Sequence, residues 1–280
     1  MLHAIRTAFL APLALIALVP LAQAQTTDAE KTAALFDALG LPDMIAIMRE
    51  EGLAYGDEIA TDLLSTTTNA KWDETVSDIY DLDRMRDGAA AALDAALAGN
   101  DVDAMLAFFT SDLGAEIITL ETSARRALLD DAVDEAAKQS AGVALEADTP
   151  RSQLVTRFVE TNDLIDTNVV GAMNANFAFY MGLQDGGAFD AELTEDQVLT
   201  DVNDQEPQIR QNTTEWVYGF LMMAYQPLSD DELQAYIDFS ATEPGQQLNA
   251  AMFDAFDQMF VTISRQLGRA SAEYMAGQDI

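Results

Sequence analysis

The apolar residues of this 280-residue chain recur at intervals of three and four positions, and this spacing constrains the fold more than any other feature. An α-helix completes a turn every 3.6 residues, so this spacing places apolar side chains on one face of a helix, whereas a strand would alternate them. Residues that end helices are few and clustered, with 15 glycines and 7 prolines. The sequence therefore predicts an all-α fold, a bundle of helices that pack through their apolar faces.

Capping residues, glycines and prolines divide the chain into expected helices. Thr149-Pro150 is a typical helix start, and capping boxes begin at Thr194 and Ser229. We expect Pro207 to break the helix that the first box opens, because proline lacks the amide hydrogen that a helix interior needs. The expected helices cover about 28–39, 44–64 (ending in the polar cluster 65–69), 72–98, 102–109, 112–145, 150–185, 195–206, 216–225, 230–240 and 243–275.

The first 24 residues have the features of a secretory signal peptide. An arginine lies near the start, an apolar run covers 8–21, and Ala22-Gln23-Ala24 is a small-residue cleavage site. Pro12 and Pro20 interrupt the run, which is shorter than the about 20 residues that a membrane span needs. We expect cleavage after Ala24, no membrane span in the mature chain, and a periplasmic or secreted protein.

Histidine and cysteine are absent from the expected mature chain. The sequence has no cysteine, and its one histidine is His3, within the signal peptide. Disulfides, thiolate nucleophiles, serine and cysteine triads, the usual zinc ligand sets and histidine acid-base catalysis are therefore excluded. We expect no metal site and no cofactor. A non-catalytic protein is favoured, and the rival class is an enzyme that acts through carboxylates alone.

Acidic residues outnumber basic residues by 48 to 14, which gives a formal net charge of -34. A field of this sign repels phosphate backbones and anionic lipid headgroups, which argues against nucleic acid as a partner. Since 49% of the residues are hydrophobic, the chain can still bury a core. The acidity therefore indicates a solvated acidic surface rather than disorder.

Two stretches 131 residues apart show the same order of features, since 101–125 aligns with 232–256 without gaps. Each has a short helix with an aromatic residue, a hydroxyl residue that can cap the next helix, a glycine that lets a neighbouring helix approach, and then a long helix. This pattern predicts two helix-helix corners and an internal duplication with halves at 25–148 and 149–280. The corner residues are Ser111, Gly114, Thr242, Pro244 and Gly245.

The residues around the two corners resemble a known family. In the first copy these are Ser111-Asp112-Leu113-Gly114, Glu121 and Ala124-Arg125-Arg126, and in the second copy they are LSDDELQAYIDFSATEPGQQL at 228–248. They are similar to the secreted bacterial family called domain of unknown function 2059, and the second half holds the better match. The resemblance implies an exported helical protein with no established activity, and it supplies no catalytic residues.

Glu121, Arg125 and Arg126 form the candidate polar binding site, because basic residues are rare in this chain. Glu121 and Arg125 are four residues apart and could form a surface ion pair worth about 0.3–0.5 kcal/mol. The alternative is that the adjacent arginines bind an anion or a partner. In the second copy Met252 and Phe256 occupy the positions of Glu121 and Arg125, so any function of the charged pair belongs to the first copy.

Aromatic and methionine side chains concentrate in the second half, with a dense apolar block at 216–225. We expect a non-catalytic binding or interaction protein of the cell envelope, whose partner is an unknown envelope protein or an apolar small molecule. The alternatives are a periplasmic hydrolase that uses carboxylates alone, and a carrier of an apolar ligand or lipid that uses the second half. A wide apolar cavity under 216–225 would favour ligand binding, and a cleft with two close carboxylates would favour the hydrolase.

Overall fold

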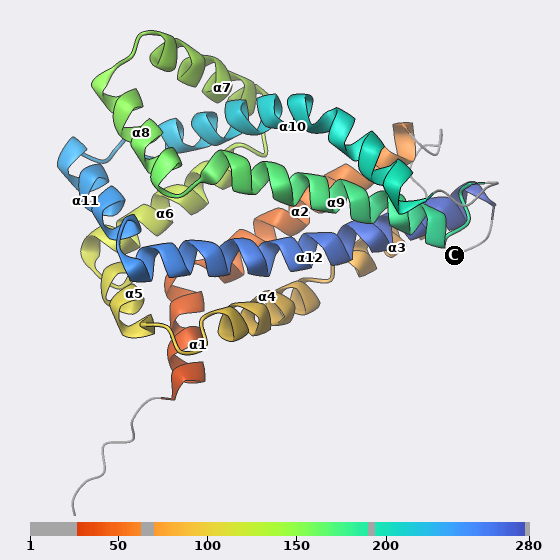
Figure 1. Ribbon diagram of the computed structural model, residues 1–280, viewed down its shortest axis with the longest axis horizontal. Helices are drawn as coiled ribbons and strands as arrows, with labels where there is room; N and C mark the ends of the chain where they lie inside the picture. The colour runs from red at the N-terminus through yellow and green to blue at the C-terminus, as the bar shows by residue number, and fades with distance from the viewer. Residues whose placement is uncertain (1–26, 63–69, 190–193, 278–280) are drawn as a thin grey trace, which may run out of the picture.

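The computed structural model describes residues 27–62, 70–189 and 194–277, and within these ranges every regular element is an α-helix (Figure 1). The predicted all-α fold is confirmed for this part of the chain. The expected signal peptide with cleavage after Ala24, and the polar cluster 65–69, lie outside these ranges. None of the described helices combines the length and the apolar character that a bilayer crossing needs.

Local capping explains where most of the helices begin. The predicted capping boxes at Thr194 and Ser229 are present, and Thr149 caps the helix that starts at Pro150. The helices are α1 (Asp28–Ala38), α2 (Leu41–Asp62), α3 (Ala70–Ile79), α4 (Leu82–Ala96), α5 (Val102–Phe109), α6 (Asp112–Ala127), α7 (Asp131–Glu146), α8 (Pro150–Thr161), α9 (Leu164–Asp185), α10 (Glu195–Ala224), α11 (Asp230–Ser240) and α12 (Glu243–Met275).

Three helices that the apolar spacing predicts as continuous are each divided at an aspartate. The carboxylates of Asp81 and Asp130 accept hydrogen bonds from backbone amides and cap α4 and α7. Asp163, before α9, has a left-handed backbone with φ of 49°. Apolar spacing continues across each break, so periodicity alone does not reveal that the chain changes direction there.

Pro207 lies inside the 30-residue helix α10, so the prediction that it breaks this helix is wrong. Proline removes one amide hydrogen bond from a helix, at a cost of about 3 kcal/mol. The helix packs against α9 and α7 along its length, and this packing offsets the local loss. The apolar block 216–225 is consequently the end of α10 rather than a separate helix.

Buried side chains form two core clusters, and each combines helices from both predicted halves. The first cluster contains buried side chains from α1 to α5 and from α12, and the second contains buried side chains from α6, α8, α10 and α11. Helix α12 therefore crosses the molecule beside α9 and α4, although it comes last in the chain (Figure 1). The core is not divided at the predicted boundary near residue 148.

The closest helix pair is α9 and α12, and glycines bring their backbones together. A Cβ atom at Gly182 of α9 would lie 2.1 Å from the carbonyl oxygen of Arg265 in α12. A Cβ atom at Gly268 of α12 would lie 2.1 Å from the carbonyl oxygen of Phe179 in α9. Real Cβ contacts are never this short, so each glycine makes room for the other helix.

The two predicted corners have nearly the same geometry. Ser111 accepts a hydrogen bond of 3.1 Å from the amide of Gly114, and Thr242 accepts one of 3.2 Å from the amide of Gly245. A Cβ atom at either glycine would lie 2.2 or 2.3 Å from the carbonyl oxygen six residues earlier. Pro244 occupies the first turn of α12, where the missing amide hydrogen costs nothing. Each corner residue thus has the local role that the sequence predicts.

The aromatic residues that precede the corners stack on one another. The rings of Phe108 and Phe239, which are 131 positions apart, lie parallel with centroids 4.0 Å apart and an interplanar angle of 9°. A two-fold axis that relates two copies brings equivalent residues into contact in this way. The contact joins equivalent positions of the two predicted copies, and the internal duplication stays a prediction.

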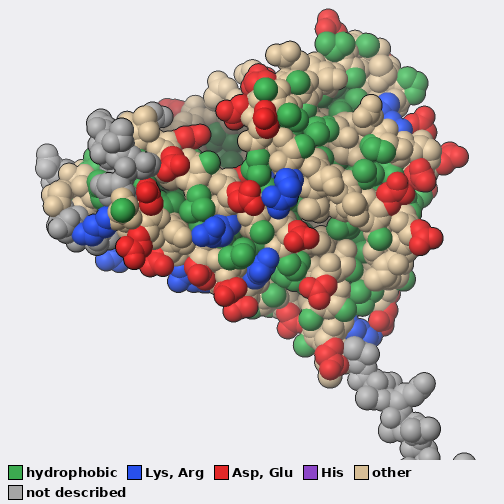
Figure 2. All heavy atoms as spheres, turned by 180° about the vertical axis from the view of Figure 1, so that it is seen from behind, with side chains coloured by type: hydrophobic (Ala, Val, Ile, Leu, Met, Phe, Trp, Pro, Cys, Tyr) green, Lys and Arg blue, Asp and Glu red, His purple; other side chains and the backbone are tan. Residues whose placement is uncertain are grey.

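Acidic side chains are spread over the face shown in Figure 2 and do not gather in one patch. This distribution is typical of a solvated acidic surface. Within the described ranges, no group of three acidic side chains could hold a metal ion.

Candidate functional site

A cavity of about 290 Å³ lies between the two core clusters, close to the stacked corners. It extends beneath the apolar block 216–225, which contributes four of its lining side chains besides Tyr225. Most of the lining is apolar or aromatic, and examples are Met44, Phe158, Trp216, Phe220, Leu221 and Phe253. The cavity is thus the kind of apolar space that the sequence associates with ligand binding.

Both copies of the predicted repeat line the cavity with corresponding residues. Four pairs of lining positions are 131 residues apart, and they are Phe109 with Ser240, Ile118 with Asn249, Glu121 with Met252, and Arg125 with Phe256. Two similar walls therefore face the same space, as a duplicated helix pair would produce. The walls differ in chemistry, since the first copy supplies both charges and the second supplies apolar side chains at the same positions.

Glu121, on α6, presents its carboxyl group to the cavity, where two tyrosines bind it. The hydroxyl of Tyr225, at the end of α10, donates a hydrogen bond of 2.6 Å to Oε1 of Glu121. The hydroxyl of Tyr236, on α11, also interacts with this carboxyl group and lowers its pKa. The carboxyl group is therefore held between helices from the two halves.

Burial controls the charge of this group. Burial raises the pKa of Glu121 to about 7, although the hydrogen bonds from Tyr225 and Tyr236 act in the opposite direction. Burial also raises the pKa of both tyrosines well above its ordinary value. Glu121 thus changes its charge near neutral pH while the surrounding phenols stay neutral.

An aromatic cluster fixes the two tyrosines. The ring of Phe158, on α8, lies 5.4 Å from the ring of Tyr225 at an angle of 85°, and 4.8 Å from the ring of Tyr236 at 40°. The two tyrosine rings are themselves 6.0 Å apart and nearly perpendicular. Two of these contacts are edge-to-face, an arrangement that stabilises the orientation of the rings and therefore of their hydroxyls.

Arg125 lies one helical turn after Glu121 and binds a different acid. Its Nε donates a hydrogen bond of 2.7 Å to one carboxylate oxygen of Glu51 on α2, and one terminal nitrogen donates a hydrogen bond of 2.7 Å to the other. The guanidinium carbon also lies 4.8 Å from the ring centroid of Trp216 on α10. The interpretation of Glu121 and Arg125 as a surface ion pair is wrong, because tertiary packing supplies each with a partner from another helix.

Arg126 points away from the cavity and pairs at 3.2 Å with Glu50 on α2. The side chains of both residues are about half exposed, at 52% and 50%. An exposed pair of this kind contributes little to stability. The structure therefore brings Glu121 and Arg125 together at the cavity and leaves Arg126 outside it.

The sequence did not identify the hydroxyls that bind Glu121. The rings of Tyr225 and Tyr236 belong to the second core cluster, and apolar spacing predicts only this packing role for them. A buried phenol needs a hydrogen-bond partner, and this requirement is the signal that could have marked them. The partner of Tyr225 is 104 residues away, so no local spacing points to it.

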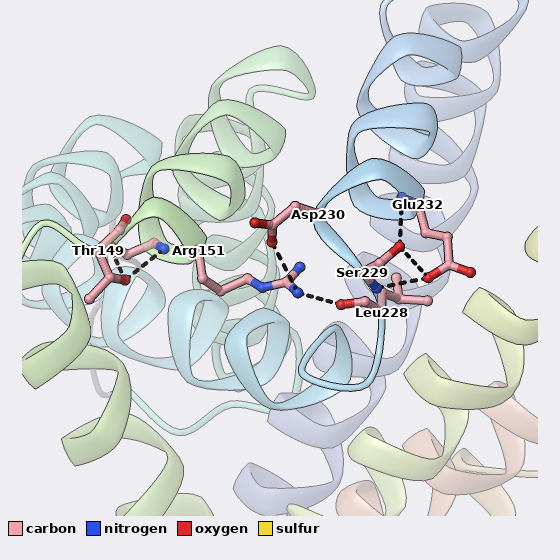
Figure 3. Close-up of polar contacts among 7 residues, drawn as sticks. Thr149, Arg151, Leu228, Ser229, Asp230 and Glu232 are labelled. Carbon is pink, nitrogen blue, oxygen red and sulfur yellow. Dashed lines mark hydrogen bonds and ion pairs between the residues drawn. The ribbon is translucent and has the colours of Figure 1, made fainter.

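A polar cluster holds the turn between α10 and α11. Arg151, on α8, donates a hydrogen bond to the carbonyl oxygen of Leu228 and pairs with Asp230 at 3.2 Å (Figure 3). Tyr225 precedes this turn and Tyr236 follows it. The cluster therefore anchors to α8 the turn that joins the ends of the chain carrying the two tyrosines.

A second pocket of about 510 Å³ adjoins the cavity. Val170, which is 55% exposed, lines this outer pocket, so it opens at the molecular surface. The pocket and the cavity share the lining residues Met48, Arg125, Asn168, Trp216, Phe253 and Phe256. The contact between Arg125 and Trp216 is consequently part of the wall between the cavity and the surface.

The fold and this site define an all-α protein with a small, mostly apolar cavity that contains one titratable carboxyl group. Residues 83–141 match the sequence model of a family described as an uncharacterized protein conserved in bacteria (DUF2059). The match confirms the predicted resemblance, and it includes the first corner together with Glu121 and Arg125. It lies within the first predicted half, whereas the sequence predicts the better match in the second half. Comparisons with curated proteins and with solved structures found no match.

Proposed function

We propose that this protein binds a small apolar molecule in the cavity between its two core clusters, and that it acts as a non-catalytic binding protein of the cell envelope. The observation that carries the proposal is the cavity of about 290 Å³ with its largely apolar lining. Ligand sites are typically concave and apolar with a few convergent polar groups, and they begin at about 300 Å³. A cavity of this size suits a small ligand.

The composition of the lining favours binding over hydrolysis by carboxylates. Carboxylate-only glycoside hydrolysis uses two carboxyl groups about 5–10 Å apart on either side of the scissile bond. Among the residues that line the cavity, Glu121 is the one acid, and Arg125 is the one base. The remaining polar lining groups are amides and hydroxyls, which orient a ligand but do not supply the second carboxylate.

The envelope location rests on the signal-peptide features of residues 1–24. Expression of the full-length chain in bacteria, followed by cell fractionation, tests it. The mature protein should appear in the periplasm or the medium, with an N-terminus at Gln25. Retention of the complete chain in the cytoplasm would contradict the location without affecting the binding proposal.

Ligand binding is tested with N-phenyl-1-naphthylamine, an apolar dye that fluoresces when it leaves water. The wild-type protein should bind it saturably at one site. Met252→Trp places a bulky ring in the cavity wall and should abolish this binding, whereas Met275→Trp, at the exposed end of the same helix, should not. Circular dichroism checks that both variants remain folded. Equal binding by the two folded variants, or no binding by the wild type, would refute the proposal.

A further inference from the structure

We propose that the ligand is an organic ammonium compound, with an apolar body in the cavity and a protonated amine bound to the carboxylate of Glu121. This inference rests on the proposed function, because it assigns the ligand class of the same cavity. Three features of the site lead to it: the balance of charge, the aromatic rings around the carboxylate, and the field of the whole molecule.

The charge balance of the lining leaves an opening for a cation. Arg125 is the positively charged lining residue, and its guanidinium group is already bound to both carboxylate oxygens of Glu51 at 2.7 Å. The carboxyl group of Glu121 accepts a hydrogen bond from the hydroxyl of Tyr225, and neither this hydroxyl nor that of Tyr236 carries a charge, because burial raises the pKa of both. A buried carboxylate is costly without a cationic partner, so a ligand that supplies the cation gains the most from this position.

The surroundings of the carboxylate also suit an ammonium group. Tyr225, Tyr236 and Phe158 form a tight cluster, with ring centroids between 4.8 and 6.0 Å apart. The faces of aromatic rings attract cations, and aromatic cages beside a carboxylate are typical of ammonium recognition. All three rings line the cavity, and one tyrosine hydroxyl lies 2.6 Å from the carboxylate.

The electrostatic field of the whole molecule also favours a positively charged ligand. The formal net charge of -34 raises the local concentration of cations and repels anions. A fatty acid would add a second carboxylate next to Glu121, and two like charges in an apolar site disfavour each other. Arg125 offers an anion little in return, because Glu51 and Trp216 already occupy its guanidinium group.

Calorimetric titration with three probes of equal chain length tests the inference: n-octylammonium, 1-octanol and octanoate. The titrations are run at pH 8, above the pKa of about 7 at which Glu121 ionises. The ammonium probe should bind about 10- to 100-fold more tightly than the alcohol, as expected for a charge-assisted hydrogen bond. Octanoate should bind more weakly than the alcohol.

Glu121→Gln retains the shape of the side chain and removes its charge. This variant should lose the 10- to 100-fold preference for n-octylammonium and bind 1-octanol as the wild type does, which also shows that its cavity is intact. Glu116→Gln is the matched control, since Glu116 is exposed on the same helix and should leave all three affinities unchanged.

The failure of this inference differs from the failure of the proposed function. Equal binding of ammonium and alcohol, or an unchanged preference in Glu121→Gln, would overturn the ammonium assignment and leave the apolar site in place. Preferential binding of octanoate would also overturn it. Binding of none of the three probes, together with no binding of the fluorescent dye, would refute the proposed function itself.

Discussion

Replacing Glu121 by glutamine should change how the stability of the protein depends on pH. In the folded protein burial raises the pKa of Glu121 from an ordinary value of 4.5 to about 7. The folded state therefore holds an additional proton between these two pH values, whereas the unfolded chain has already lost it. Burial favours the neutral carboxyl group over the charged one.

The sign and size of the effect follow from this difference. Because the folded state binds more protons, the contribution of Glu121 to stability is fully present below pH 4.5 and is lost as the pH rises to about 7. The complete loss is about 3 kcal/mol, of which roughly 2–3 kcal/mol falls between pH 5 and pH 8. Tyr225 and Tyr236 stay neutral over this range, because burial raises the pKa of both, so they do not obscure the transition.

Urea unfolding at pH 5, 6, 7 and 8, followed by circular dichroism, measures the effect. Glutamine does not ionise, so the free energy of unfolding of Glu121→Gln minus that of the wild type should increase by about 2–3 kcal/mol from pH 5 to pH 8. Subtracting the wild type removes the other carboxylates of this acidic chain. Glu116→Gln, on the exposed side of α6, should show a constant difference. A constant difference for Glu121→Gln as well would refute the claim that packing holds this carboxyl group neutral.

Two further changes test the packing around the site. Gly182→Ala should reduce the free energy of unfolding by about 1–3 kcal/mol, because the new Cβ would lie 2.1 Å from the α12 backbone. The control is Gly142→Ala in α7, an exposed position with nothing within 4 Å, which should raise the free energy of unfolding by up to about 1 kcal/mol. Similar urea midpoints for the two variants would contradict the close helix contact. Arg125→Met removes the bidentate contact with Glu51 and should cost about 1 kcal/mol in low salt and less in 0.5 M NaCl, with a shift in the fluorescence of Trp216. A variant as stable as the wild type with unchanged emission would show that this contact does not hold the cavity wall.

Much of the helical structure is predictable because its causes are local. Thr149, Ser229 and Thr242 cap helices through amides three residues away, and the apolar spacing of each helix repeats within two turns. The same locality explains the errors. Asp81 and Asp130 end one helix direction and begin another without disturbing the apolar period, and Pro207 is accommodated by contacts with distant helices.

Part of the candidate site is predictable for a different reason. Glu121 and Arg125 stand out because charged residues at these positions have apolar counterparts in the second copy, and both residues do line the cavity. Their partners could not be found in the same way. Glu51 lies 74 residues from Arg125, and Tyr225 lies 104 residues from Glu121. Arg126 looked equivalent to Arg125, and only its direction on the helix separates a cavity residue from a surface residue.

Local interactions of the chain were sufficient to specify an all-α protein, two capped corners and a surface of strong negative charge. They act over a few residues, through helix period, capping and composition, and can be read directly from the order of the residues. The cavity and the raised pKa of Glu121 arise where helices from both halves meet, and the pairing of Arg125 with Glu51 joins two helices of the first half. These properties depend on burial and on distances between residues far apart in the chain, and only the packed molecule sets those.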